Sequence, residues 1–269
     1  MATDKPELFP ASPRVHYENA PLIQVTAQLR FPPLLSIESK PPVEFQERIR
    51  SHFPLMQKVP DGLPPGLPPE VAQVLRAQTA IAAYNFMVED RTTTVTLTPQ
   101  SLALSTTNYT RWEDFRNNLR VPLAALSDQY RPSFFSRIGL RYQNAIDRVR
   151  LGLSAVSWSE LLRREILGEL ALPQLENNLE GVVDRKLRFK NPDGSGSVAI
   201  HHGLANVQGH DGLCYVIDTD FFTNEKKEIA NAEAILNHFN ELAGVAFRWC
   251  ITDKLRGALR PTQLAAASG

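Results

Sequence analysis

The stretch Ile23-Gln24-Val25-Thr26-Ala27-Gln28-Leu29-Arg30-Phe31 decides the fold class, because apolar and polar side chains alternate along it. Alternation with a period of two is typical of a β-strand with one face in the core and the other turned to water or a partner. Pro32 and Pro33 end the strand, since proline cannot donate the hydrogen bonds of a sheet. The sequence therefore predicts a sheet with one polar face.

The chain that follows, up to residue 150, predicts a first α+β unit. Phe45, Ile49 and Phe53 recur every four residues, which indicates a short helix. Residues 59–69, VPDGLPPGLPP, indicate an extended loop, and residues 71–83 fit either a helix or a strand. Strands are expected at residues 84–88, 92–98, 102–104 and 137–142. The resulting order, βαββαβ, suits a ferredoxin-like arrangement.

A long helix of this unit is expected to begin near Thr110. Thr110 and Glu113 have the spacing of a capping box, in which each side chain bonds the backbone amide of the other residue. Because proline lacks an amide hydrogen, Pro122 predicts a kink or a break in this helix. The apolar stripe with helical spacing consists of Trp112, Phe115, Leu119, Leu123 and Leu126.

Residues 151–260 predict a second α+β unit, of the order βββα. A helix is expected at residues 158–170, and Thr252 or Asp253 is expected to cap a short last helix. The strands are expected around residues 183–189, 198–200 and 213–217. The long helix has a continuous apolar face, formed by Ala232, Ile235, Leu236, Phe239, Leu242, Ala243, Ala246 and Phe247.

The predicted organisation is thus α+β, with two units that each lay a long helix over antiparallel strands. The first unit spans residues 22–150 and the second spans residues 151–260. Residues 1–21 are expected to form an extended arm and residues 261–269 a disordered tail.

Composition indicates a globular protein of neutral charge. The chain has 29 Lys and Arg against 29 Asp and Glu, and 43% of its residues are hydrophobic. Zero net charge argues against a chain held to nucleic acid by bulk charge, since such domains are strongly basic. The chain shows neither a signal peptide nor an apolar run long enough to cross a membrane. We therefore expect a cytoplasmic protein whose two cysteines, Cys214 and Cys250, are free thiols.

The most metal-like group of residues lies in the second unit. His201 ends one predicted strand, His210 lies in the next loop, and Asp218 and Asp220 are two apart on the following strand. That spacing puts both carboxylates on one strand face, as in enzymes that hold a divalent ion to transfer nucleotidyl or glycosyl groups. Solvated acids and loop histidines are the favoured interpretation, because no Gly-Ser turn opens a helix before the acids.

Three arginines form a second candidate site. Arg137 and Arg141 share a face of one predicted strand with Gly139, and Arg30 lies on the polar face of the first strand. If these strands are neighbours, the guanidinium groups would line a surface for an acidic or phosphate-bearing partner. Surface ion pairs with the many glutamates are the favoured alternative.

Two motifs lie on predicted strands: residues 17–25, YENAPLIQV, with 29–32, LRFP, and residues 137–146, RIGLRYQNAI. Together with the stretch at residues 218–221, DTDF, and the closing helix, they resemble a sporadically distributed prokaryotic protein family of about this length. Its central signature is Gly-Leu-Arg-Tyr-x-Asn-x-Ile, and its biochemistry is unassigned. The resemblance implies a setting in mobile or conflict-related gene neighbourhoods and implies no catalytic residue.

Motifs of familiar enzymes are absent from the sequence, including G-x-S-x-G, the P-loop and G-x-G-x-x-G. We therefore predict a non-enzymatic accessory protein of a prokaryotic defence or toxin–immunity system, which binds a protein partner and needs no cofactor. One alternative is a metal-dependent enzyme that acts on nucleotides or phosphoesters through Asp218 and Asp220. Another alternative, a nucleic-acid-binding module, would use Arg30, Arg137 and Arg141.

Overall fold

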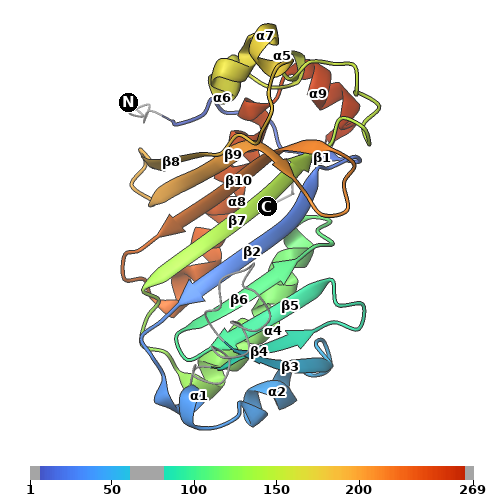
Figure 1. Ribbon diagram of the computed structural model, residues 1–269. Coiled ribbons are helices and arrows are strands. Elements are labelled where there is room, and N and C mark those ends of the chain that lie inside the picture. The colour runs from blue at the N-terminus through green and yellow to red at the C-terminus, as the bar shows by residue number, and fades with distance from the viewer. Residues whose placement is uncertain (1–6, 61–81, 264–269) are drawn as a thin grey trace. The chain divides into compact units, whose positions relative to one another are not determined.

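The computed structural model describes residues 7–60 and 82–263 of the chain. It is a mixed α/β protein with antiparallel sheets (Figure 1). The chain divides into two compact units, and each is assembled from segments that are distant in sequence. The terminal unit comprises Met1–Val25, Leu140–Thr223 and Asn237–Gly269, and the central unit comprises Thr26–Gly139 and Asn224–Leu236. The observed units therefore interleave, whereas the sequence predicted consecutive ones.

The central unit is a sheet with one helix, α4 (Trp112–Tyr130), laid over one face (Figure 1). Two shorter helices, α1 (Leu35–Ser39) and α2 (Val43–Ile49), precede most of its strands, and α2 packs against α4. Its strands are β2 (Leu22–Arg30), β3 (Leu55–Pro60), β4 (Ala82–Met87), β5 (Thr93–Thr98) and β6 (Ser101–Thr106). They lie in the order β3-β4-β5-β6-β2, and the first residues of β7 (Arg137–Ile146) follow β2.

The alternation in β2 is confirmed, because Val25, Ala27 and Leu29 are fully buried. The ferredoxin-like order is not confirmed, because four strands lie between the helices where that arrangement has two. Strand β3 was not predicted, because its side chains, among them the exposed Met56 and Lys58, do not alternate between apolar and polar. The expected loop begins inside β3 at Val59, and its remainder lies outside the described residues, as does most of the segment at 71–83.

Helix α4 differs from its prediction at two points. It continues through Pro122 without a break, and its cap residue, Arg111, makes no capping hydrogen bond. The hydroxyl of Thr110, the expected cap residue, donates to a carboxylate oxygen of Asp114 at 2.8 Å. We attribute the continuity to the apolar stripe, because its burial outweighs the one backbone hydrogen bond that proline removes. The buried stripe includes Trp112, Phe115, Leu119 and Leu126.

The terminal unit has a sheet in the order β2-β7-β10-β9-β8, with α8 (Ala232–Cys250) laid over one face (Figure 1). Its further strands are β8 (Arg185–Lys190), β9 (Ser197–Asn206) and β10 (Leu213–Thr223). The short helices are α5 (Trp158–Leu161), α6 (Arg164–Leu167), α7 (Pro173–Glu176) and α9 (Asp253–Ala258). The apolar face predicted for α8 is confirmed, since Leu236, Phe239, Ala243 and Ala246 are buried. Among the described residues, no helix is long and apolar enough to cross a membrane.

The helix predicted at residues 158–170 is wrong in its continuity. Leu162 and Arg163 are extended and separate α5 from α6. Leu162 forms a β-bridge with Ile251, and the amide of Arg163 donates to the carbonyl of Cys250 at 3.0 Å. The segment after α8 thus takes up hydrogen bonds that a continuous helix would have used.

The two ends of the described chain pair with each other in a separate two-stranded sheet. It consists of β1 (Val15–Tyr17) and β11 (Pro261–Gln263), which run antiparallel. The expectation of a disordered tail from residue 261 is therefore wrong for these three residues, because β1 supplies their hydrogen-bonding partner.

Candidate functional site

Asp218, on β10, is held by an arginine of β7. The Nε of Arg141 donates to Oδ1 of Asp218 at 2.7 Å, and Nη2 donates to Oδ2. The side-chain amide of Gln143 also donates to Oδ2, at 3.4 Å. The Asp218 side chain is 6% exposed, whereas that of Arg141 is 47% exposed. The carboxylate is therefore covered and neutralised, which leaves it poorly placed to hold a divalent ion.

The other predicted metal ligands have different partners. Asp218 and His201 are paired across β10 and β9, but Nε2 of His201 donates to Asp184, and Asp220 is paired in register with Ala199. His210 lies with Nδ1 at 2.9 Å from Oδ2 of Asp147. The structure thus brings His201 beside Asp218 and places His210 in another group.

Arg30 and Arg137 lie on neighbouring strands of the central unit, as the arginine hypothesis requires. The amide of Ser136 donates to the carbonyl of Arg30 at 2.7 Å, which joins the end of β2 to the start of β7. Nη1 of Arg137 donates to Oε1 of Gln28 at 3.1 Å, and the guanidinium lies over Gly139, where a Cβ would collide with it. Arg137 is thus engaged by its own sheet, and Arg141 by Asp218.

Two exposed apolar side chains lie side by side on one face of β8, the outermost strand of the terminal unit. We call Arg185–Lys190 the β8 edge. It pairs only with β9, and no described residue forms a backbone hydrogen bond with its outer side. Leu187 and Phe189 are 45% and 41% exposed, although their cross-strand partners Ile200 and Val198 are buried. The apolar face of the sheet therefore continues beyond its core to an open edge.

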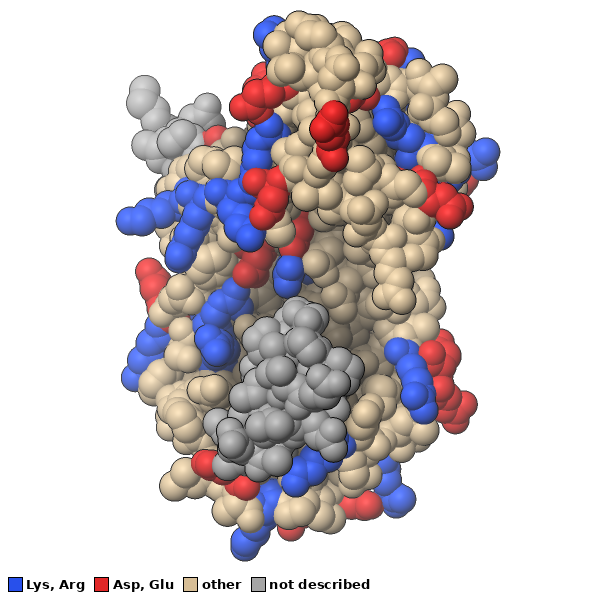
Figure 2. All heavy atoms as spheres, in the orientation of Figure 1, with Lys and Arg blue, Asp and Glu red and all other residues tan. Residues whose placement is uncertain are grey.

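The β8 edge is also strongly basic on its other face. Lys186 and Arg188 alternate with the two apolar residues, and Figure 2 shows Lys and Arg side chains gathered along this edge. Lys186 lies 3.4 Å from Asp184, and the guanidinium of Arg188 lies 4.7 Å from the centre of the Phe222 ring. Within the described chain, neither Arg188 nor Lys190 has a carboxylate partner. Two cations are therefore available to a ligand.

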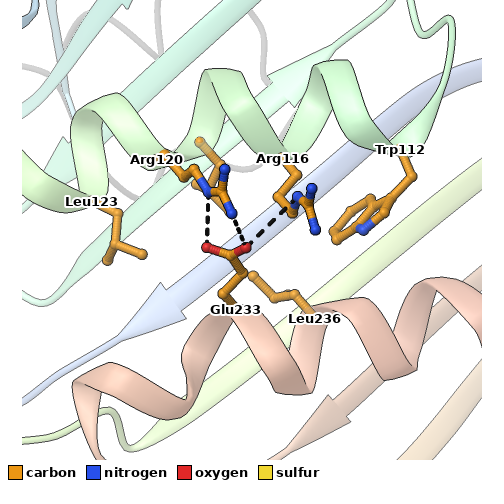
Figure 3. Close-up of a pocket in the computed structure, with 7 residues that line it drawn as sticks. Trp112, Arg116, Arg120, Leu123, Glu233 and Leu236 are labelled. Atoms are coloured by element: carbon orange, nitrogen blue, oxygen red, sulfur yellow. Dashed lines mark hydrogen bonds and ion pairs between the residues drawn. The ribbon is translucent and has the colours of Figure 1, made fainter. Parts of the chain in front are cut away.

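A pocket of the central unit is closed by an ion cluster rather than open to a ligand (Figure 3). Arg120, on α4, donates from Nε to Glu233 at 2.9 Å, and Nε of Arg116 lies 3.6 Å from the same carboxylate. The hydrogen bond from Arg120 lowers the pKa of Glu233, so the charge of the cluster is maintained. The cluster joins α4 to the first turn of α8 within this unit.

Neither cysteine is suited to nucleophilic catalysis. Burial raises the pKa of the Cys214 thiol to about 11 and that of Cys250 to about 12. Because the thiolate is the attacking form, a thiol held neutral by burial is a poor nucleophile. The sequence expectation of free thiols agrees with the structure.

Two features of the terminal unit were not predicted from the sequence. A strand was expected near β8, but its place at an edge was not, because strand order depends on contacts with distant residues. Asp147 and Cys214 were not expected as neighbours of His210, since 63 residues separate Asp147 from His210. In the sequence, the strongest signal for the edge is the alternation of basic and apolar residues in Arg185–Lys190.

Comparison with known proteins gives no match, either to a family model or to a curated protein.

Proposed function

We propose that this chain is a non-catalytic binding protein whose β8 edge takes up an extended segment of a partner protein as an added strand. The observation that carries the proposal is the outer side of β8, which no described residue pairs with. It has Leu187 and Phe189 on one face and, on the other, two cations without a carboxylate partner among the described residues. Strand addition of this kind gains affinity from backbone hydrogen bonds and specificity from alternate side chains.

The chemistry of the β8 edge specifies the segment. Its apolar residues would cover Leu187 and Phe189, and its acidic residues, on the other face, would meet Arg188 and Lys190. A partner segment in which acidic and apolar residues alternate would complement both faces of β8 at once. The partner's setting, a prokaryotic defence or toxin–immunity system, rests on the family resemblance alone.

The two alternative functions have less support. Asp218 would have to give up Arg141 and Gln143 before it could bind an ion together with Asp220. Arg137 is held by Gln28, and no exposed aromatic pair stands near it to stack bases among the described residues. In calorimetry with Mg²⁺ or Mn²⁺, the wild type and Asp218→Asn are expected to give the same titration.

A defined peptide tests the proposal. A capped octapeptide of alternating glutamate and valine is expected to bind at low salt, and a peptide of the same composition in two blocks is expected to bind at least about tenfold more weakly. The double variant Arg188→Glu, Lys190→Glu should lose the preference for the alternating peptide over the block peptide. Lys58→Glu on β3, the edge strand of the central unit, is the matched control and should retain it.

Fluorescence anisotropy measures both peptides against each variant. Equal binding of the two peptides, or unchanged binding by the double variant, would contradict the proposal. Binding of a single-stranded oligonucleotide in place of the alternating peptide would favour the nucleic-acid alternative instead. Co-elution with the products of neighbouring genes, abolished by the same double variant, would then identify the natural partner.

A further inference from the structure

Three potential metal ligands of different chemistry meet in the terminal unit. Asp147 directly follows β7, His210 lies in the turn between β9 and β10, and Cys214 is the second residue of β10. One donor atom from each residue lies within 4.8 Å of the other two. The side chains of Asp147 and His210 are only 6% and 8% exposed, and Cys214 is 1% exposed.

The carboxylate of Asp147 is fixed before any ligand arrives. Its Oδ1 accepts hydrogen bonds from the amides of Val149 at 2.8 Å and Arg150 at 3.2 Å, which leaves Oδ2 aimed at His210. The orientation of the carboxylate is therefore set by its own backbone contacts.

An open pocket of about 250 Å³ adjoins the group. Asp147 and His210 line it, together with Arg150 and the chain from Asn19 to Ile23. The pocket gives an ion a path from solvent and leaves room for a water or a small ligand in the remaining coordination position.

We propose that Asp147, His210 and Cys214 bind one divalent transition-metal ion, with Zn²⁺ as the preferred metal. Thiolate, imidazole and carboxylate together are donors that Zn²⁺ accepts, and three protein ligands with one open position are typical of its non-structural sites. Tetrahedral zinc with bonds of about 2.0–2.3 Å separates its ligand atoms by about 3.3–3.6 Å. The observed donor atoms lie within 4.8 Å of one another, so they must approach by up to about 1.5 Å to reach that spacing. The metal displaces the thiol proton on binding.

The positive charge of Arg150 is the main source of electrostatic repulsion against a cation at this site. Its Nε lies 3.7 Å from Oδ2 of Asp147, and its Nη2 donates to the carbonyl of Gly209 at 2.6 Å. Removal of this positive charge in Arg150→Gln is expected to tighten metal binding about fivefold. A loose surface ion would respond much less to this substitution.

Titration of the metal-free full chain with Co²⁺ tests the proposal directly. A tetrahedral cobalt spectrum with a thiolate-to-metal charge-transfer band is expected, and Zn²⁺ should displace it in a ratio of one ion per chain. Cys214→Ser, His210→Gln and Asp147→Asn should each weaken binding by more than about 100-fold. Cys250→Ala, His52→Gln and Asp218→Asn are matched controls and should leave the spectrum unchanged.

X-ray absorption of the zinc-loaded wild-type chain keeps the test independent of how the variants fold. One sulfur at about 2.3 Å and nitrogen or oxygen ligands at about 2.0 Å are expected. A cobalt spectrum without the thiolate band, a zinc site without sulfur, or loss of binding through Cys250→Ala would overturn the proposal. The peptide experiment on β8 does not depend on these outcomes.

Discussion

Asp218 is a buried carboxylate whose charge is met by the half-exposed guanidinium of Arg141. The two hydrogen bonds form a planar fork, and Gln143 adds a third. A buried ion of this kind is stable only while its partner remains, because the cost of desolvation is otherwise uncompensated. The pair therefore has a structural role that explains both residues without a bound metal.

Removal of the arginine should expose this dependence. Arg141→Ala is expected to lower the free energy of unfolding by about 1–3 kcal/mol, between the values for surface and fully buried pairs. Denaturant unfolding measures the loss. Arg48→Ala breaks an ion pair with Asp128 whose two side chains are 48% and 60% exposed, and should cost less than about 1 kcal/mol. Equal losses in the two variants would contradict the structural role, and Asp218→Asn should restore part of the stability lost with Arg141.

His202 is a buried histidine in a chain of hydrogen bonds. The hydroxyl of Tyr215 donates to the carbonyl of Ile166 at 3.0 Å and lies 3.0 Å from Nδ1 of His202. Because the hydroxyl has one hydrogen, Nδ1 of the neutral ring must be the donor in the second bond. Burial, with smaller contributions from the charges of Arg185 and His201, lowers the pKa of His202 to about 4.

This shift predicts a dependence of stability on pH. The unfolded chain protonates His202 at its ordinary pKa of about 6.5, so the unfolded state binds more protons than the folded state between pH 6.5 and 4. Stability should fall as the pH is lowered through this window, by up to about 3 kcal/mol. The free energy of unfolding should be lower at pH 5 than at pH 7 in the wild type and in His52→Gln. Most of this difference should be absent in His202→Gln. An unchanged difference in His202→Gln would refute the assignment.

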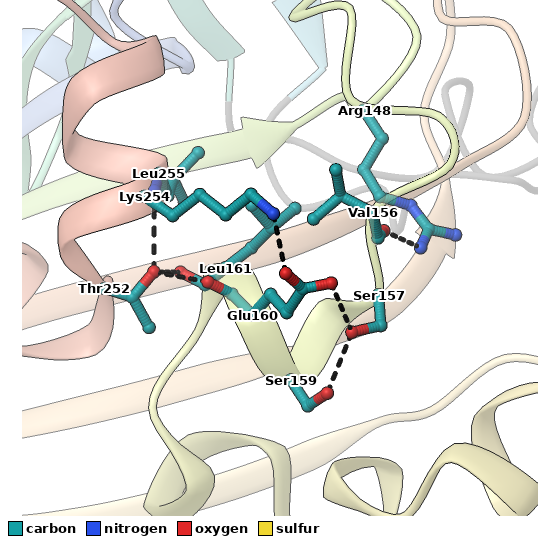
Figure 4. Close-up of polar contacts among 9 residues, drawn as sticks. All are labelled: Arg148, Val156, Ser157, Ser159, Glu160, Leu161, Thr252, Lys254 and Leu255. Atoms are coloured by element: carbon teal, nitrogen blue, oxygen red, sulfur yellow. Dashed lines mark hydrogen bonds and ion pairs between the residues drawn. The ribbon is translucent and has the colours of Figure 1, made fainter.

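At the scale of elements, the sequence predicts a feature correctly where that feature depends on only three or four neighbouring residues. Thr252 caps α9 as predicted, and its hydroxyl accepts from the amide of Leu255 at 3.4 Å (Figure 4). The same hydroxyl donates to the carbonyl of Glu160 at 2.6 Å, which ties α9 to α5. Only the first of these two bonds was foreseeable, because the second depends on a residue 92 positions away.

The double use of this hydroxyl gives a stability prediction. Thr252→Ala should lower the free energy of unfolding by about 1–2 kcal/mol, since it removes a helix cap and a bond between elements. Thr252→Ser should retain most of that stability. Lys254→Ala, which removes only the exposed pair with Glu160, should cost less than about 0.5 kcal/mol and serves as the control in thermal unfolding.

Helices and strands differ from the local prediction where residues distant in sequence form hydrogen bonds with the same backbone groups. Leu162 and Arg163 have helical neighbours, yet their backbones pair with Cys250 and Ile251. The opposite holds for Pro122, where burial of an apolar stripe preserved a helix that local propensity would have interrupted. Periodicity therefore predicted which faces are buried better than it predicted where elements end.

At the scale of the whole molecule, the α+β class and the long helix α8 were predictable from periodicity, and the assignment of residues to units was not. Asp147, His210 and Cys214 illustrate why the grouping of candidate site residues was not predictable either. Their chemistry is visible in the sequence, but their proximity depends on the order of β7, β10 and β9. The grouping of His210 with Asp218 followed their closeness along the chain, and the sheet order replaced that partner with Asp147.

The interleaving of the two units governs the order in which a ribosome can complete them. The terminal unit draws on Met1–Val25 and on Asn237–Gly269, so its first strand residues emerge long before the helices that complete its core. The central unit is complete once Leu236 has emerged. A nascent chain arrested after Leu236 should accordingly protect the amides of β4–β6 from hydrogen exchange while those of β8–β10 still exchange freely. Emergence of Asn237 and the residues after it would then be the event that allows the terminal unit to close around its core.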